Sequence, residues 1–147
     1  MKDLLNAAEM KAVDQRSIEE YGIPSLVLME RAALEVVKRA GELLEPGLSG
    51  NEALEYGPGR ERLLKERKRK TVWAVCGFGN NGADGVAAAR MLTLQGFSSV
   101  ILLPSLEGKR SRELEVQLSV AEKLGIPILT LGDPLPEACD LIIDAVF

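Results

Sequence analysis

The second half of the chain alternates short apolar runs with segments of helical periodicity, and this alternation restricts the fold more than any other feature. The apolar runs lie at 71–76, 99–103, 126–131 and 140–147. Helical spacing occupies 84–95 and 109–124 between them. Strands that are apolar along their whole length suit a parallel sheet with both faces covered. We therefore expect an α/β fold with a mostly parallel sheet.

The first half of the chain predicts two helices ahead of this array. Asn6 and Glu9 have capping-box spacing, and apolar residues then recur at helical intervals over 7–21. The breaker Gly22-Ile23-Pro24 separates this helix from a longer one over 25–44. Together with the strand and helix alternation, this predicts a Rossmann-like, three-layer α/β/α fold preceded by two amino-terminal helices.

Composition and charge exclude several functional classes. The chain has 147 residues, of which 46% are hydrophobic and 27% charged, as in a globular protein with one domain. Its net charge of -4 offers no general attraction for nucleic acid or an anionic membrane. The amino terminus lacks a signal peptide and no apolar run reaches membrane-spanning length, so we expect a cytoplasmic protein that binds neither membrane nor nucleic acid.

The middle of the chain predicts exposed structure. Glycines and prolines interrupt the periodicity over 45–59, which predicts a surface loop. The segment 60–70 contains seven basic residues interleaved with glutamates, which favours a solvated helix over a phosphate-binding face.

Histidine is absent from the sequence, and only two cysteines are present. The absence of histidine excludes Ser-His-Asp and Cys-His catalysis and histidine metal ligation, so proton transfer would use carboxylates, lysines, tyrosines or the substrate. Cys76 and Cys139 lack metal-site spacing, and we expect both to be buried, reduced thiols.

The strongest local motif is Cys-Gly-Phe-Gly-Asn-Asn-Gly-Ala-Asp-Gly over 76–85, between the first strand and the following helix. Gly77, Gly79 and Gly82 match Gly-x-Gly-x-x-Gly. Glycine permits positive φ and close backbone approach, and the free amides of a helix start favour an anionic group such as a pyrophosphate. The motif predicts a nucleotide or phosphorylated ligand, although a tight strand-to-helix turn would also use glycine.

Polar side chains gather where the strands are expected to end. Asn80, Asn81 and Asp84 lie in the glycine-rich segment, which we expect to be a loop, and Asp144 lies late in the fourth strand. The carboxyl ends of parallel strands share one edge of a sheet, so these groups can converge into a cation or proton-transfer site. The alternatives are a turn cap for Asp144 and a helix-start charge for Asp84.

An ordinary NAD-dependent oxidoreductase is disfavoured. Such enzymes place an acidic residue at the end of the second strand to bind the ribose hydroxyls. Here Pro104 and Ser105 follow that strand, and Glu107 lies beyond the proline.

Three separated motifs resemble the NAD(P)H-hydrate epimerase family, also called the YjeF N-terminal domain. Residues 8–14 and 21–30 are similar to its amino-terminal helices. Residues 79–85 resemble its Gly-Asn-Asn-Gly-Gly-Asp-Gly signature, and residues 144–147 resemble the start of its Asp-Ala-x-Phe-Gly segment.

The resemblance implies interconversion of the R and S epimers of hydrated NADH and NADPH, with the S form passed to a separate or fused ADP/ATP-dependent dehydratase. It also implies a bound potassium ion and a homo-oligomer. The resemblance assigns substrate contacts to Asn80, Asn81, Gly82, Ala83 and Asp84. It assigns potassium to Asn81 and Asp144, and Asp144 is also the carboxylate that it places near the chemistry.

Several positions depart from the family pattern. Ala83 stands where the family usually has glycine, and Arg31 where many members have asparagine. Ser105 stands where some relatives carry lysine, and the loop spacing does not establish whether Lys109 takes that place. The downstream glycine-rich segment and an Asp-x-Pro-Ser-Gly motif are absent, so we expect 1–147 to be one domain truncated at its carboxyl end. A non-catalytic binding or scaffold module is the alternative.

Overall fold

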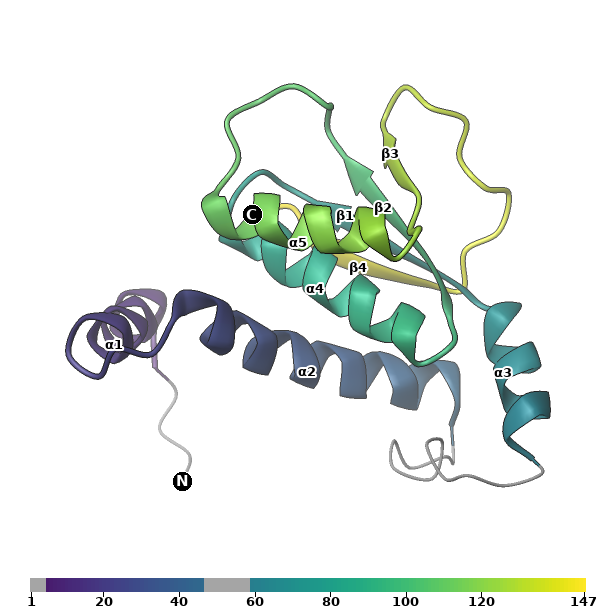
Figure 1. The fold of residues 1–147 in the computed structure, drawn as a ribbon, viewed down its shortest axis with the longest axis horizontal. Coiled ribbons are helices and arrows are strands. Elements are labelled where there is room, and N and C mark those ends of the chain that lie inside the picture. The colour runs from purple at the N-terminus through teal and green to yellow at the C-terminus, as the bar shows by residue number, and fades with distance from the viewer. Residues whose placement is uncertain (1–4, 47–58) are drawn as a thin grey trace.

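The computed structural model describes residues 5–46 and 59–147, which form an α/β fold around a four-stranded sheet (Figure 1). The strands are β1 (Thr71–Cys76), β2 (Ser98–Leu103), β3 (Ile128–Thr130) and β4 (Leu141–Ala145). Their order in the sheet is β3-β2-β1-β4, and every neighbouring pair is parallel. The predicted α/β class and parallel sheet are confirmed.

Within the described residues, five helices accompany the sheet. They are α1 (Ala7–Glu19), α2 (Ser25–Leu44), α3 (Arg60–Lys68), α4 (Asn80–Leu94) and α5 (Arg112–Lys123). The predicted capping box is present at α1, where Asn6 Oδ1 accepts from the Glu9 N–H and the Glu9 carboxylate accepts from the Asn6 N–H. The expectation of two amino-terminal helices is therefore confirmed.

Some element boundaries differ from the sequence prediction. α4 begins at Asn80 instead of residue 84, because the glycine-rich segment is itself helical in its second half. α5 begins at Arg112 instead of residue 109, because Ser111 accepts from the Leu114 N–H and caps the helix. The third and fourth strands are shorter than predicted, and most of the predicted 45–59 loop lies outside the described residues.

Helix α4 is the centre of the core. It crosses the sheet between α2 and α5, and nine of its residues are buried. One core cluster joins α4 to α5, β1 and β2 through Val86, Ile101 and Leu114. A second joins its other side to α2 through residues such as Val37 and Leu92. Small side chains along α4 allow the three helices to pack closely.

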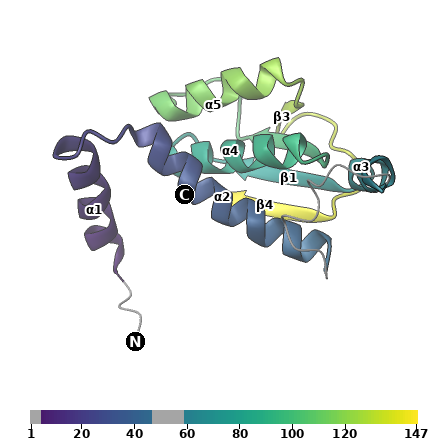
Figure 2. The same ribbon diagram turned by 60° about the horizontal axis from the view of Figure 1, so that its bottom comes forward.

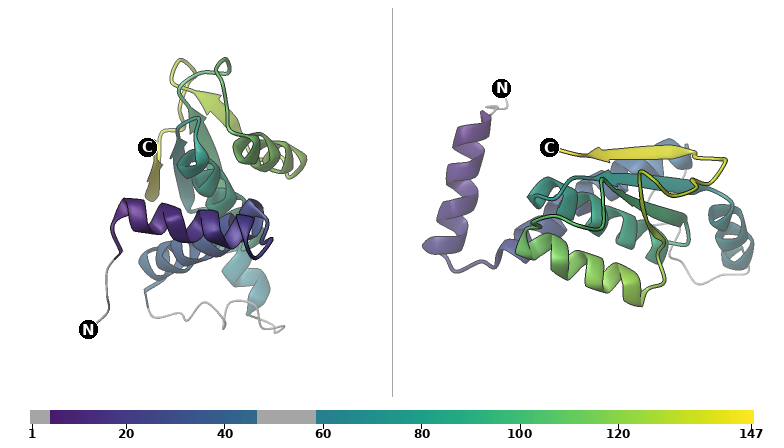
Figure 3. Two further views of the ribbon diagram at one scale, coloured as in Figure 1. Left: turned by 90° about the vertical axis from the view of Figure 1, so that its left-hand side faces the viewer. Right: turned by 90° about the horizontal axis from the view of Figure 1, so that it is seen from above.

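The described helices α2, α4 and α5 lie on one side of the sheet (Figures 1 and 3). In β1, Val72 and Ala74 are buried toward these helices, whereas Trp73 and Val75 alternate with them and belong to neither core cluster. Trp73 is in register with Ile142 of β4, which is exposed. Among residues 5–46 and 59–147, the helical layer expected on this second face is not present.

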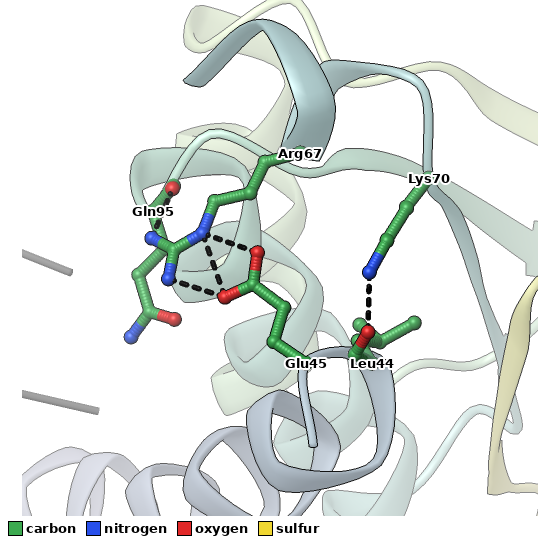
Figure 4. Close-up of polar contacts among 5 residues, drawn as sticks. All are labelled: Leu44, Glu45, Arg67, Lys70 and Gln95. Atoms are coloured by element: carbon green, nitrogen blue, oxygen red, sulfur yellow. Dashed lines mark hydrogen bonds and ion pairs between the residues drawn. The ribbon is translucent and has the colours of Figure 1, made fainter. Parts of the chain in front are cut away.

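The sequence predicted a solvated helix over 60–70, but the basic helix α3 is partly buried. Arg67 is buried and binds the buried Glu45 carboxylate through Nε and Nη2, at distances of 2.6 to 3.0 Å (Figure 4). Arg67 also donates to the Gln95 carbonyl, and Lys70 donates to the Leu44 carbonyl. These contacts join the ends of α2 and α4 to α3.

Cys76 is buried as predicted, and burial raises the pKa of its thiol to about 12, so it has little thiolate character. Cys139 is only partly buried, which corrects the expectation for that residue. In the part of the chain that the structure describes, no helix is both long and apolar enough to cross a bilayer.

Candidate functional site

The turn from β1 into α4 depends on glycine for steric reasons. A Cβ on Gly77 would lie 2.1 Å from the Val146 carbonyl oxygen, and one on Gly82 would lie 2.0 Å from the Gly77 carbonyl oxygen. Gly77, Gly79 and Gly82 do not have positive φ, which corrects that part of the sequence interpretation. Close backbone packing therefore explains Gly77 and Gly82, while Gly79 faces open space.

Residues 80–84 form the first turns of α4 and not a loop. Gly79 is the residue before the helix, and no side chain caps the helix start. Gly82 and Ala83 are buried, and the Ala83 methyl lies in the core. Asn80, Asn81 and Asp84 are therefore the members of this segment whose side chains reach the surface or a cavity.

A cavity of about 510 Å³ lies between α1, α2 and the start of α4. Asn80 and Asp84, four residues apart on one face of α4, line it from one side. Figure 2 shows α1 set apart from the sheet, beyond the amino-terminal end of α2. The remaining lining residues come from α1 and α2: Met10, Asp14, Ile18, Ser25, Leu28, Met29, Arg31, Ala32 and Glu35.

Among the described residues that line this cavity, Asp84 is the one whose pKa is shifted. Burial, with a smaller contribution from the negative charge of Asp14 on α1, raises the pKa of its carboxyl to about 6. The other charged groups that line the cavity are Arg31 and Glu35 on α2. A carboxyl with a pKa near 6 can accept or donate a proton close to neutral pH.

Asn81 and Asp144 lie outside this cavity. Asp144 is exposed, is in register with Val75, and its Oδ1 accepts from the Val146 N–H at 3.2 Å. Asn81 lies one helical turn before Gly85, where a Cβ would be 2.6 Å from the Ala145 Cβ. That spacing places Asn81 on the side of α4 that faces the end of β4. The structure thus does not bring Asp144 into the cavity with Asp84.

The amide oxygen of Asn81 and the carboxylate of Asp144 are oxygen donors of the kind that a hard cation takes. Within the described residues there is no group of three or more histidine, cysteine or acidic side chains that could hold a metal ion. Asn81 and Asp144 would therefore supply two oxygen ligands, which is part of the coordination shell of such a cation.

A family profile described as "YjeF-related protein N-terminus" matches residues 25–147. The chain belongs to this family. The sequence resemblance to this family is thereby confirmed.

Relatives of this YjeF-related chain carry the name NAD(P)H-hydrate epimerase. The Oenococcus oeni protein is 40% identical over 136 residues, covering 91% of this chain and 53% of the relative. The Weissella koreensis protein is 36% identical, covering 100% of this chain and 56% of the relative. The chain therefore spans little more than half the length of these relatives.

The fold of the YjeF-related chain also matches a solved structure. The crystal structure of the yeast protein ynu0 superposes with a TM-score of 0.70 at 23% sequence identity, covering 99% of this chain and 57% of that one. At this level of identity the match supports the fold alone.

The sequence prediction missed the cavity residues of α1 and α2. Met10, Asp14 and Ile18 recur every four residues, so they share one face of α1, and Asp14 interrupts an otherwise apolar stripe. A polar residue within an apolar stripe was the sequence signal that could have identified Asp14 as a site residue. Lys109 does not line the cavity; it is exposed in the segment after β2, whose Gly108 lies against the Phe78 ring.

Proposed function

We propose that this protein is an NAD(P)H-hydrate epimerase, an isomerase that interconverts the R and S epimers of hydrated NADH and NADPH. The observation that carries the proposal is the half-buried Asp84, beside Asn80, in a cavity at the start of α4 in a chain of the YjeF-related family. The names of the relatives, which cover nearly the whole chain, support the same activity.

The start of α4 supplies the substrate contacts in this proposal. Asn80 offers amide donor and acceptor groups and Asp84 a carboxyl group, while Gly82 and Ala83 contribute through backbone atoms only, since both are buried. The helix start lacks a side-chain cap, so its first amides favour the anionic diphosphate of the substrate. Asn81 completes the contact set from the adjacent side of α4.

Asn81 and Asp144 would hold a potassium ion at the end of β4. A bound cation there would neutralise charge and orient polar substrate groups. Asp144, at the carboxyl end of a parallel strand, is also the carboxylate that the proposal places near the chemistry, through the cation that it would hold.

The proposed function also includes a partner enzyme and an oligomeric state. The S epimer would be passed to a separate or fused ADP/ATP-dependent dehydratase, and the active form would be a homo-oligomer. A cytoplasmic location and one domain over residues 1–147 remain predictions from the sequence.

Epimer exchange tests the function. Purified R-epimer of hydrated NADH is supplied with potassium and an S-specific dehydratase, and its consumption is followed for the full-length protein, the 147-residue chain and the Asp144→Ala variant. Glu137→Ala, an exposed acidic position ahead of β4, is the matched control. Rapid consumption that requires Asp144 and survives Glu137→Ala supports the epimerase. No consumption with any form would favour the scaffold alternative.

A further inference from the structure

The cavity between α1, α2 and α4 combines apolar walls with carboxyl groups. Met10 and Ile18 of α1 and Leu28 and Met29 of α2 supply the apolar surface. The acidic groups are Asp14, Glu35 and Asp84, against the single cation Arg31 among the lining residues. A ligand group bound here must therefore be largely apolar and must not be anionic.

We propose that this cavity receives the hydrated nicotinamide ring and that Asp84 is a catalytic proton-transfer residue for its epimerisation, with Asp14 as a positioning residue. The inference rests on the proposed function and extends it by placing the two ends of the substrate. It also assigns a role to α1, which otherwise makes few contacts with the rest of the fold.

Charge determines which end of the substrate enters the cavity. The diphosphate would meet the negative charges of the exposed Asp14 and Glu35 and of the partly buried Asp84, and like charges repel. The hydrated ring is uncharged and carries a carboxamide and a hydroxyl, whose hydrogens can be donated to carboxylates. The diphosphate then remains outside, near the uncapped start of α4.

The position of Asp84 suits proton transfer to the ring hydroxyl. In its neutral form Asp84 donates a proton to that oxygen while the carbon–oxygen bond breaks and water leaves. The lone pair of the ring nitrogen forms a carbon–nitrogen double bond. Water then adds to the opposite face of the same carbon, the electron pair returns to nitrogen, and the added water releases one proton to solvent. Asp84 regains a proton from solvent, so the configuration changes without oxidation or reduction.

Asp14 would increase the fraction of Asp84 that is protonated close to neutral pH. Burial, the larger cause, and the Asp14 carboxylate together raise the pKa of Asp84 to about 6. Glu35 adds negative charge and Arg31 opposes it from α2. Since the chain contains no histidine, a carboxyl group with a raised pKa takes the role of the commonest acid–base group.

Kinetics of Asp84→Asn in the full-length protein test the catalytic role. We expect kcat for epimer exchange to fall by about 100-fold or more, with KM changed only a few-fold, as for loss of a general acid. A raised KM with an unchanged kcat would overturn the catalytic assignment, because it would show a binding role only.

The pH profile of Asp14→Asn tests the positioning role. Removing this charge lowers the pKa of Asp84, so the decline of kcat toward high pH should begin at lower pH than in the wild type. Glu19→Gln, an exposed change on α1 outside the cavity, should leave the profile unchanged. An unshifted profile in Asp14→Asn would overturn the role of Asp14.

The two proposals fail in different ways. No epimer exchange by the wild-type protein would overturn the proposed function and this inference together. Normal exchange by both the wild type and Asp84→Asn would overturn this inference alone and leave the epimerase function standing.

Discussion

The fold disfavours the ionised form of the Asp84 carboxyl group. Its pKa is raised from 3.8 to about 6, so between these values the folded state binds more protons than the unfolded state. Its contribution to stability is therefore fully present below pH 3.8 and is lost as the pH rises through 6. At neutral pH the ionised carboxylate costs stability, which is common for groups held ready for chemistry.

Replacing Asp84 with the neutral, similarly shaped asparagine should stabilise the protein at pH 7. After allowance for solvent screening of a half-buried group, we expect the free energy of unfolding to rise by about 1 kcal/mol. Urea unfolding followed by the fluorescence of Trp73, the single tryptophan, measures the change. The gain should vanish near pH 4, and a gain that is independent of pH would contradict the electrostatic cause.

The pKa of Glu113 is shifted in the direction opposite to that of Asp84. The Ser25 hydroxyl donates to its carboxylate at 2.6 Å and lowers its pKa below 4.5. The stability from this contact is present above pH 4.5 and is lost as the pH falls through the lowered value. Glu113→Gln should therefore weaken the protein at pH 7, and the difference from the wild type should shrink on acidification.

Gly82 should tolerate no side chain. A Cβ there would lie 2.0 Å from the Gly77 carbonyl oxygen, which is backbone and cannot move away cheaply. We expect Gly82→Ala to lower the free energy of unfolding by about 3 kcal/mol, the upper range of overpacking. Gly41→Ala is the control, because nothing lies within 4 Å of its Cβ and helix propensity should stabilise it by about 0.5–1 kcal/mol. Equal effects of the two changes would contradict the close contact.

At the scale of elements, the ion pair of Arg67 and Glu45 fixes the end of α2 against α3 (Figure 4). The Arg67 guanidinium also lies 5.0 Å from the centre of the Phe97 ring. We expect Arg67→Met to cost about 3–5 kcal/mol in urea unfolding, because it leaves Glu45 buried without its partner. Combining it with Glu45→Leu should recover much of this loss.

Arg62→Met is the matched control in the same helix. Arg62 pairs with Glu66 at the surface, where both side chains are largely exposed. Exposed pairs contribute little, so the change should stay within about 0.5 kcal/mol. A similar loss in both variants would show that α3 responds to any change of charge.

The order of strands and helices could be predicted because apolar periodicity is a local property of the sequence. The start of α4 could not, since glycines in its first turns carry the composition of a loop. The burial of Arg67 and the raised pKa of Asp84 depend on contacts with α2 and α1, which are distant in sequence. For the same reason the motif predicted Asn80 and Asp84 at the candidate site but not Asp14.

At the scale of the whole molecule, β4 lies at the edge of the sheet that residues 5–46 and 59–147 form, with an apolar groove beside it. The groove has a volume of about 410 Å³ between β4 and α2. Leu43 and Ile142 line it and are 55% and 58% exposed. An unpaired parallel strand beside exposed apolar side chains favours association with another chain.

We therefore expect the 147-residue chain to self-associate through this groove. Sedimentation velocity over a range of protein concentrations should show mass increasing with concentration for the wild type. Ile142→Lys should shift the distribution toward the monomer, because a lysine in the groove would lose its hydration on association. Leu94→Lys, which changes a similarly exposed apolar residue at the end of α4, should leave association unchanged. If both variants reduce association equally, general surface hydrophobicity is responsible, and the edge of β4 is not the contact.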